Sequence, residues 1–125
     1  MDFTVKDNIL RLGQLEVEFP YEISNTERFG RIILVITDYY SSDINENVWG
    51  VNEKGEIIWQ IPKVDEVEFE GKKYKGITAP YTGVRKIDEK TARLFNLEGG
   101  YFEIDPSTGK FTKNIIEFRK EKRPW

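Results

Sequence analysis

The chain has 125 residues, 22 of them acidic and 19 basic, and it contains neither cysteine nor histidine. Without cysteine it cannot form a disulfide, a thiolate zinc site or a thiol nucleophile. Without histidine it lacks the usual general base near neutral pH and the commonest metal ligand, so we predict no metal site and no cofactor.

Hydrophobic residues make up 38% of the chain and charged residues 33%, which is typical of one folded domain over residues 1–125. The longest apolar run, Ile32–Ile36, is too short to span a membrane. The segment Met1–Val5 lacks the basic start and apolar stretch of a signal peptide. We therefore expect a soluble, cytoplasmic protein with no membrane partner.

The first predicted elements are two short strands, Asn8–Leu12 and Leu15–Phe19, joined by a turn at Gly13-Gln14. In the second strand hydrophobic residues alternate strictly with glutamates, so one face is expected to lie on a core and the other in water. The residues expected to face the core are Leu15, Val17 and Phe19.

The segment Ile32–Ile36 has no polar face, because its five residues are all β-branched or aliphatic. A strand that is covered on both sides has this composition, so we place it at the centre of the fold. A polar, aromatic loop follows it. This loop supplies the candidate binding residues, since loop tyrosines offer a large contact area at low entropic cost. They are Asp38, Tyr39, Tyr40 and Asp43.

The clearest hairpin joins Val48–Val51 to Glu56–Ile61 through a turn that ends at Gly55, which supplies the positive φ. Its two tryptophans are expected to anchor the core because their neighbours are apolar, although such rings can also stack on a base or a sugar. The tryptophans are Trp49 and Trp59, and the residues expected to share one face of the second strand are Ile57, Trp59 and Ile61.

A charged strand pair is predicted next, with acids opposite lysines across a turn at Gly71-Lys72. Two further strands are predicted at Thr82–Asp88 and Thr91–Leu97. The second of these segments also fits a short helix capped by Asp88 and stopped by Gly99. We favour a strand, because the next segment continues a meander.

The last predicted hairpin joins Tyr101–Asp105 to Lys110–Phe118 through a loop of turn-forming residues. The loop holds only one acid, Asp105, which is too few for a calcium loop. This hairpin and Val48–Ile61 share a plan that resembles the blade-forming hairpins of β-propellers, but a propeller needs a longer chain. The chain is either a compact meander of such hairpins, or the two segments share only their turn chemistry.

Charge is distributed unevenly along the chain. Residues 1–62 carry 11 acids and 5 bases, a balance of −6, whereas residues 63–125 carry 11 acids and 14 bases, a balance of +3. This asymmetry suits an oriented protein partner, and it equally fits an ordinary charged surface. The basic segment Arg119–Arg123 is too short and too mixed to indicate nucleic acid.

Three segments carry a resemblance to a known group of proteins: Asn47–Ile61, Pro80-Tyr81 and Ala92–Lys110. Over residues 31–118 the chain resembles a loose group of small, uncharacterised bacterial proteins with propeller-like hairpins. Some of these resemble immunity proteins, which bind and block a partner toxin. The resemblance implies a binding role and supplies no catalytic residues.

The sequence thus predicts an all-β or β-rich α+β fold, a compact antiparallel meander of about 8–10 short strands with at most one short helix. We expect a non-enzymatic protein-binding module, in its sharpest form an immunity-like inhibitor of a toxin. The alternatives are a structural or assembly subunit, as in phage particles, and a carbohydrate-active enzyme that uses carboxylates alone.

Overall fold

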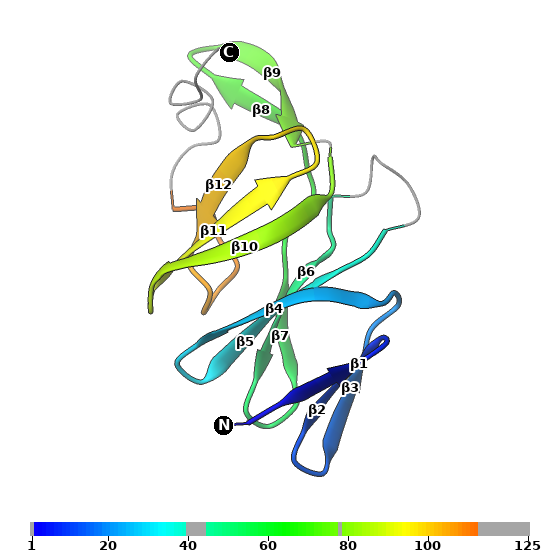
Figure 1. The fold of residues 1–125 in the computed structure, drawn as a ribbon. Coiled ribbons are helices and arrows are strands. Elements are labelled where there is room, and N and C mark those ends of the chain that lie inside the picture. The colour runs from blue at the N-terminus through cyan, green and yellow to red at the C-terminus, as the bar shows by residue number, and fades with distance from the viewer. Residues whose placement is uncertain (1, 40–44, 78, 113–125) are drawn as a thin grey trace.

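The computed structural model describes residues 2–39, 45–77 and 79–112, and all regular secondary structure in this part of the chain is β-strand (Figure 1). This confirms the all-β alternative. The described residues form twelve strands, more than the predicted eight to ten, because Thr4–Lys6 and Ile23–Phe29 also form strands. The strands are β1 (Thr4–Lys6), β2 (Ile9–Leu12), β3 (Leu15–Glu18), β4 (Ile23–Phe29), β5 (Ile32–Thr37), β6 (Val48–Asn52), β7 (Ile57–Gln60), β8 (Val64–Phe69), β9 (Lys72–Ile77), β10 (Tyr81–Asp88), β11 (Thr91–Asn96) and β12 (Tyr101–Ile104).

The strands form four antiparallel sheets, each built from strands that follow one another in the sequence. They are β1-β2-β3, β4-β5-β6-β7, β8-β9 and β10-β11-β12. In Figure 1 the four-stranded sheet lies between the two three-stranded sheets, and the β8-β9 hairpin lies at the opposite end of the molecule from β1-β2-β3. The antiparallel meander was therefore predicted correctly, since hairpin turns between neighbouring segments specify it locally.

Strand β5 is the centre of the molecule, as its unbroken apolar sequence predicts. Its side chains alternate between two cores, and residues 33–36 are completely buried. One core lies between the central sheet and β10-β11-β12. Its buried residues are Phe29, Leu34, Ile36, Val48, Trp59, Ile61, Ile77, Tyr81, Ala92, Leu94, Phe102 and Ile104. The other core lies between the central sheet and β1-β2-β3. Its buried residues are Leu10, Leu12, Val17, Phe19, Ile33, Val35, Trp49 and Val51.

The prediction that Leu15 faces the core is wrong, because this side chain is 47% exposed. Val17 and Phe19 are buried as predicted. Leu15 is the first residue of β3, beside the turn, and its side chain lies beyond the end of the core. A Cβ added to Gly55 would lie 3.4 Å from the Cβ of Leu15. The alternation therefore predicted the correct face of the strand. Leu15 is nevertheless exposed because it lies at the end of the sheet.

A β-bulge in β7 makes a second prediction wrong. Val51 pairs with Ile57 and Gly50 pairs with Trp59, so Ile58 is an extra residue in the strand. Ile57 consequently lies on the same side of the sheet as Val51, opposite to the side of Trp59 and Ile61. Ile57 and Ile58 are 46% and 42% exposed, whereas Ile61 is buried.

The segment over residues 91–96 is strand β11 and not a helix. The Asp88 carboxylate accepts a hydrogen bond from the Lys90 N–H at 2.8 Å, so it stabilises the β10-β11 turn in place of a helix start. In the β8-β9 hairpin the predicted acid–lysine pairing is confirmed by the register of Glu66 with Lys75. Its turn lies one residue earlier than predicted, at Glu70-Gly71.

Trp59 joins the central sheet to the loop that follows β12. Its indole N–H donates a hydrogen bond of 2.8 Å to the Pro106 carbonyl. A Cβ on Gly109 would lie 2.5 Å from the ring, and one on Gly50 would lie 2.2 Å from the indole nitrogen. The indole is therefore held between two glycines, which confirms that Trp59 is a core anchor.

The two hairpins that share a plan also share their turn chemistry. The Asn52 side chain accepts hydrogen bonds from the N–H groups of Lys54 and Glu56, both at 3.0 Å. The Asp105 carboxylate accepts bonds from the hydroxyl and the N–H of Ser107, at 2.7 and 2.9 Å. These bonds lower the pKa of Asp105, so its charged form is the one that stabilises the turn. The last predicted strand, Lys110–Phe118, lies within the described residues only as far as residue 112. In this part Phe111 forms an isolated bridge with Ile104.

Candidate functional site

Two of the four predicted binding residues lie in the described part of the chain. Asp38 directly follows β5 and is exposed, and Tyr39 is half-buried beside it. Tyr40 and Asp43 lie outside the described residues. The site is therefore built from Asp38 and Tyr39 and from what the fold brings beside them.

Three segments that are distant in the sequence lie side by side at this place, joined by backbone hydrogen bonds. The N–H of Asp38 donates to the Glu22 carbonyl at 2.7 Å, and the N–H of Ile23 donates to the Asp7 carbonyl at 2.9 Å. The N–H of Phe19 donates to the Asn8 carbonyl at 2.9 Å. The β1-β2 turn, the β3-β4 connection and the end of β5 consequently form one edge, on the right in Figure 1.

This edge carries four exposed carboxylates, and we call it the acidic edge. It consists of Asp7, Glu18, Glu22 and Asp38. Residues 7–8, 18–23 and 37–39, which build it, contain no lysine or arginine. Much of the −6 balance of residues 1–62 is therefore concentrated on one surface, where it produces a local negative potential.

Two tyrosines lie within the acidic edge. Tyr21 directly precedes Glu22 and Tyr39 directly follows Asp38, and the hydrogen bond from the Asp38 N–H to the Glu22 carbonyl brings these two segments together. Both tyrosines are half-buried, so each is partly exposed next to a carboxylate-bearing residue in the chain. An aromatic surface beside carboxylates can contact the methylene stems and the charges of lysine and arginine side chains.

A buried asparagine fixes the base of this edge. The Asn47 amide donates to the carbonyls of Thr37 and Tyr81, both at 2.8 Å, and its oxygen accepts the N–H of Tyr81 at 3.0 Å. These three bonds lock the end of β5 to the start of β10, so Asp38 leaves from a rigid position. Asn8 acts similarly, because its amide donates to the Phe19 carbonyl at 2.8 Å.

Sequence reasoning did not identify Asn47, Tyr21 or Glu22 as parts of a site. Glu22 becomes a neighbour of Asp38 only through the register of two strands. Asn47 is 1% exposed, and an asparagine before a strand gives no local sign of whether it is buried. Two features of the sequence could have indicated this site. One is the excess of acids in residues 1–62, and the other is the presence of tyrosines before and after the predicted strand Ile32–Ile36.

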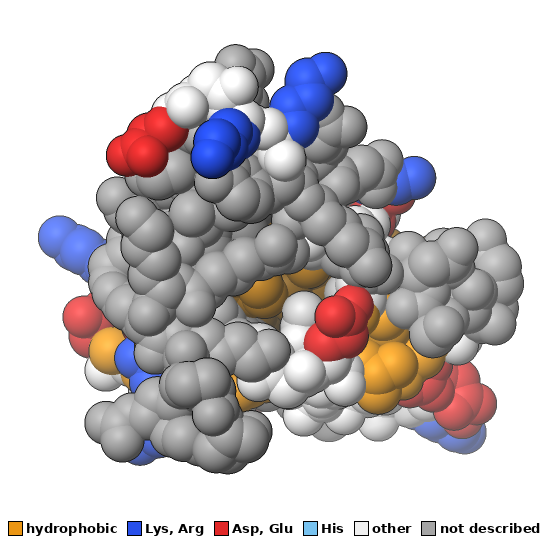
Figure 2. Space-filling view, turned by 90° about the horizontal axis from the view of Figure 1, so that it is seen from above, with side chains coloured by type: hydrophobic (Ala, Val, Ile, Leu, Met, Phe, Trp, Pro, Cys, Tyr) orange, Lys and Arg blue, Asp and Glu red, His pale blue; other side chains and the backbone are white. Residues whose placement is uncertain are grey.

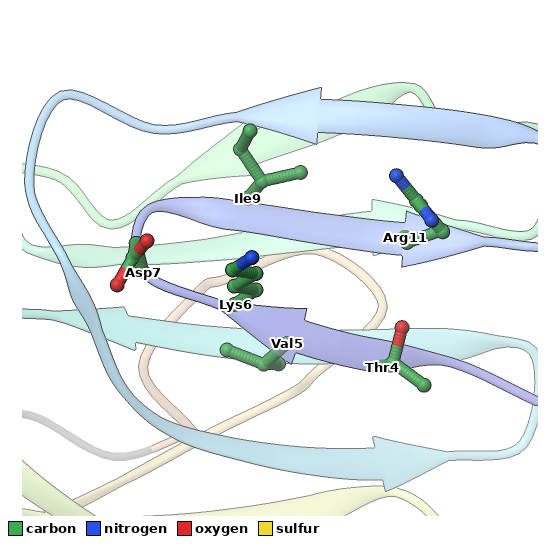
Figure 3. A pocket seen from close by; sticks show the side chains of 6 residues that line it. All are labelled: Thr4, Val5, Lys6, Asp7, Ile9 and Arg11. Atoms are coloured by element: carbon green, nitrogen blue, oxygen red, sulfur yellow. The ribbon is translucent and has the colours of Figure 1, made fainter.

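A pocket of about 480 Å³ adjoins the acidic edge at the β1-β2 hairpin (Figure 3). In Figure 3 Thr4, Lys6 and Arg11 project from the same side of the hairpin, and Asp7 lies at its turn. The volume of the pocket is in the usual range for small-ligand sites, roughly 300–1,000 Å³. The residues that line it are Thr4, Val5, Lys6, Asp7, Ile9 and Arg11.

The chemistry of this pocket is limited. Asp7 is its one carboxylate, whereas glycoside hydrolysis uses two carboxylates across the substrate. Arg11 is already paired with Glu16 on the neighbouring strand. In the described part of the chain no group of three or more acids is placed to hold a metal ion. The lining of the pocket therefore lacks the facing pair of carboxylates that a glycosidase uses.

Figure 2 looks down on the end of the molecule that carries β8 and β9. Hydrophobic side chains are visible in a hollow at the middle of this view. No helix that could cross a membrane is found among the described residues.

The chain has no significant match among curated proteins or solved structures. One family model matches it over residues 1–116, and the description of that family is "Domain of unknown function (DUF7957)". This match spans both cores, the acidic edge and every strand in the described part of the chain. The chain therefore belongs to the DUF7957 family.

Proposed function

We propose that this chain is a non-enzymatic protein-binding module that captures a basic protein surface with its acidic edge. The observation that carries the proposal is the convergence of four exposed carboxylates and two tyrosines on one rigid edge. In its sharpest form the proposal makes the chain an immunity-like protein, whose bound partner is a basic toxin.

The physical properties of the edge suit recognition. Clustered like charge accelerates the encounter with an oppositely charged partner, and it selects against acidic proteins. The tyrosines add contact area and lose little side-chain entropy on binding. Because Asn47 and the backbone bonds fix the edge before binding, little free energy is spent on ordering it.

The described sheet edges do not favour a structural or assembly subunit that pairs through its strands. β1 has only three residues, and β7 and β10 carry bulges. Short edge strands and bulges are features that prevent pairing between molecules. The carboxylates of the acidic edge are exposed on a surface, unlike the pair facing each other across a cleft that a glycosidase requires.

The test uses the full chain and the purified product of the adjacent gene as the partner. We compare wild type with the double variant Glu22→Gln, Asp38→Asn. Loss of two charges from the acidic edge should weaken binding by about tenfold, mostly through a slower association rate that also falls with added salt. Surface plasmon resonance measures both rates.

A matched double variant, Glu53→Gln, Glu56→Gln, removes the same charge from the exposed β6-β7 turn. It should bind like wild type. If the partner is a toxin, co-expression with wild type should also protect cells that its expression alone kills. Absence of binding, or equal weakening by both double variants, would refute the proposal.

A further inference from the structure

The outer face of the sheet β10-β11-β12 has two cross-strand rows of unusual composition. The inner side chains of this sheet, such as Leu94, enter the core between it and the central sheet. The outer positions form one row of Gly83, Phe95 and Tyr101, and a second row of Arg85, Arg93 and Glu103. Tyr101 is partly buried and also packs against the core. We call this surface the arginine–aromatic face.

Arg93 is held in place within this face. Its guanidinium donates two hydrogen bonds to one oxygen of Glu103, from Nε at 3.1 Å and from Nη2 at 2.7 Å. The guanidinium carbon also lies 4.9 Å from the centre of the Tyr101 ring. The three side chains thus form a fixed unit, in which Glu103 already neutralises Arg93.

Arg85 stands directly opposite Arg93 on the neighbouring strand. It is exposed, and it forms an ion pair with no carboxylate in the described part of the chain. Like charges directly opposite each other in a sheet are destabilising. The Glu103 carboxylate is hydrogen-bonded to Arg93, so among the described residues it does not neutralise Arg85, whose charge remains available for a ligand.

Phe95 provides an apolar surface next to this charge. Its side chain is 37% exposed, although it lies in the middle strand of the sheet. Its cross-strand neighbour on β10 is Gly83, which has no side chain. Even a Cβ added to Gly83 would stay 4.0 Å from the nearest atom of the Phe95 ring. One side of Phe95 is therefore open to an incoming apolar group.

We propose that the arginine–aromatic face binds an extended acidic segment of a protein partner, with a carboxylate on Arg85 and an apolar side chain against Phe95. This goes beyond the binding of a basic surface by the acidic edge and involves different residues. A single uncompensated guanidinium matches one carboxylate. A nucleic acid would need several basic contacts to its phosphates, and the chain as a whole has a net charge of −3.

The test is an NMR titration of the isotope-labelled full chain with a short peptide that alternates glutamate and leucine. Backbone signals of residues 83–85 and 93–95 should shift, with fast exchange typical of weak binding. A peptide of the same length with glutamine in place of glutamate should bind about tenfold more weakly, since a charge-assisted hydrogen bond is lost. Oligothymidylate should leave the spectrum unchanged.

Two variants locate the site. Arg85→Gln and Phe95→Ala should each weaken peptide binding by about tenfold, because each removes one of the two contacts. Arg31→Gln removes an exposed positive charge, paired with Glu53, from the β4-β5 turn and should bind like wild type. No shifts on this face, equal binding by Arg85→Gln and wild type, or stronger shifts with oligothymidylate would overturn the proposal.

Discussion

At the scale of single residues, Trp59 shows how two glycines are selected for different reasons. Gly50 lies in β6 without a positive φ, and the three atoms nearest to a Cβ there all belong to the Trp59 indole. Gly109 has a φ of +74° and is also in contact with the indole. Gly99 has a φ of +83° but has no atom near the position of a Cβ. A comparison of substitutions at these three glycines therefore distinguishes the cost of backbone strain from the cost of steric overlap.

Alanine substitutions at these glycines should therefore differ in their cost in free energy of unfolding. Gly99→Ala should cost about 1 kcal/mol, from the positive φ alone. Gly50→Ala should cost about 1–3 kcal/mol from overlap with Trp59. Gly109→Ala combines both effects and should cost about 3 kcal/mol or more. Urea unfolding followed by circular dichroism measures the three values, and equal costs for Gly99→Ala and Gly109→Ala would contradict the packing described for Trp59.

At the scale of elements, β-bulges decide which isoleucines reach the surface. In β7 the extra residue Ile58 moves Ile57 to the opposite side of the sheet from Ile61. In β10 Lys86 pairs with Ala92 and Asp88 pairs with Thr91, so Ile87 is also an extra residue and is 43% exposed. Simple alternation would have placed Ile57 in the core, and the bulge overrides it.

This effect of the bulge can be measured with two matched substitutions in one segment. Ile57→Ala should cost about 1 kcal/mol, because about half of this side chain is already in water. Ile61→Ala should cost about 2–5 kcal/mol, since it leaves a cavity in the core. The comparison uses urea midpoints at a common m-value. If Ile57→Ala were as costly as Ile61→Ala, Ile57 would have to lie in the core, and the register of β6 with β7 would be wrong.

At the scale of the whole molecule, β5 couples the two cores. Leu34 and Ile36 belong to one core, and Ile33 and Val35 to the other. Neither core can lose its packing without exposing one face of the same strand. The β4-β10 contact adds to this coupling, because the Asn25 amide donates to the Thr82 carbonyl at 3.1 Å. We therefore expect both cores to unfold together as one cooperative unit.

The two buried tryptophans provide a local probe for each core. In a Trp49→Phe, Trp125→Phe variant, fluorescence reports on Trp59 and its core. In a Trp59→Phe, Trp125→Phe variant, it reports on Trp49 and the other core. Within each variant the fluorescence midpoint in urea should equal the midpoint from far-ultraviolet circular dichroism. A separation of the two midpoints in either variant would show that the cores unfold independently.

The sequence by itself determined most of the strands and turns of this protein, with β1 and β4 missed, because alternation and turn chemistry act between residues that are close along the chain. It also placed β5 at the centre, since a strand without a polar face must be covered on both sides. The burial of Leu15 and Ile57 was predicted wrongly, because a sheet end and a bulge decide it.

Only the tertiary structure decided how the surfaces are composed. Asp38 and Tyr39 were predicted as binding residues, but Asp7, Glu18 and Glu22 join them through hydrogen bonds between distant segments. The opposition of Arg85 and Arg93 likewise follows from the β10-β11 register and its bulges. Such neighbours depend on how complete sheets pair and pack, and the free energy of that packing belongs to the whole fold and not to any local segment.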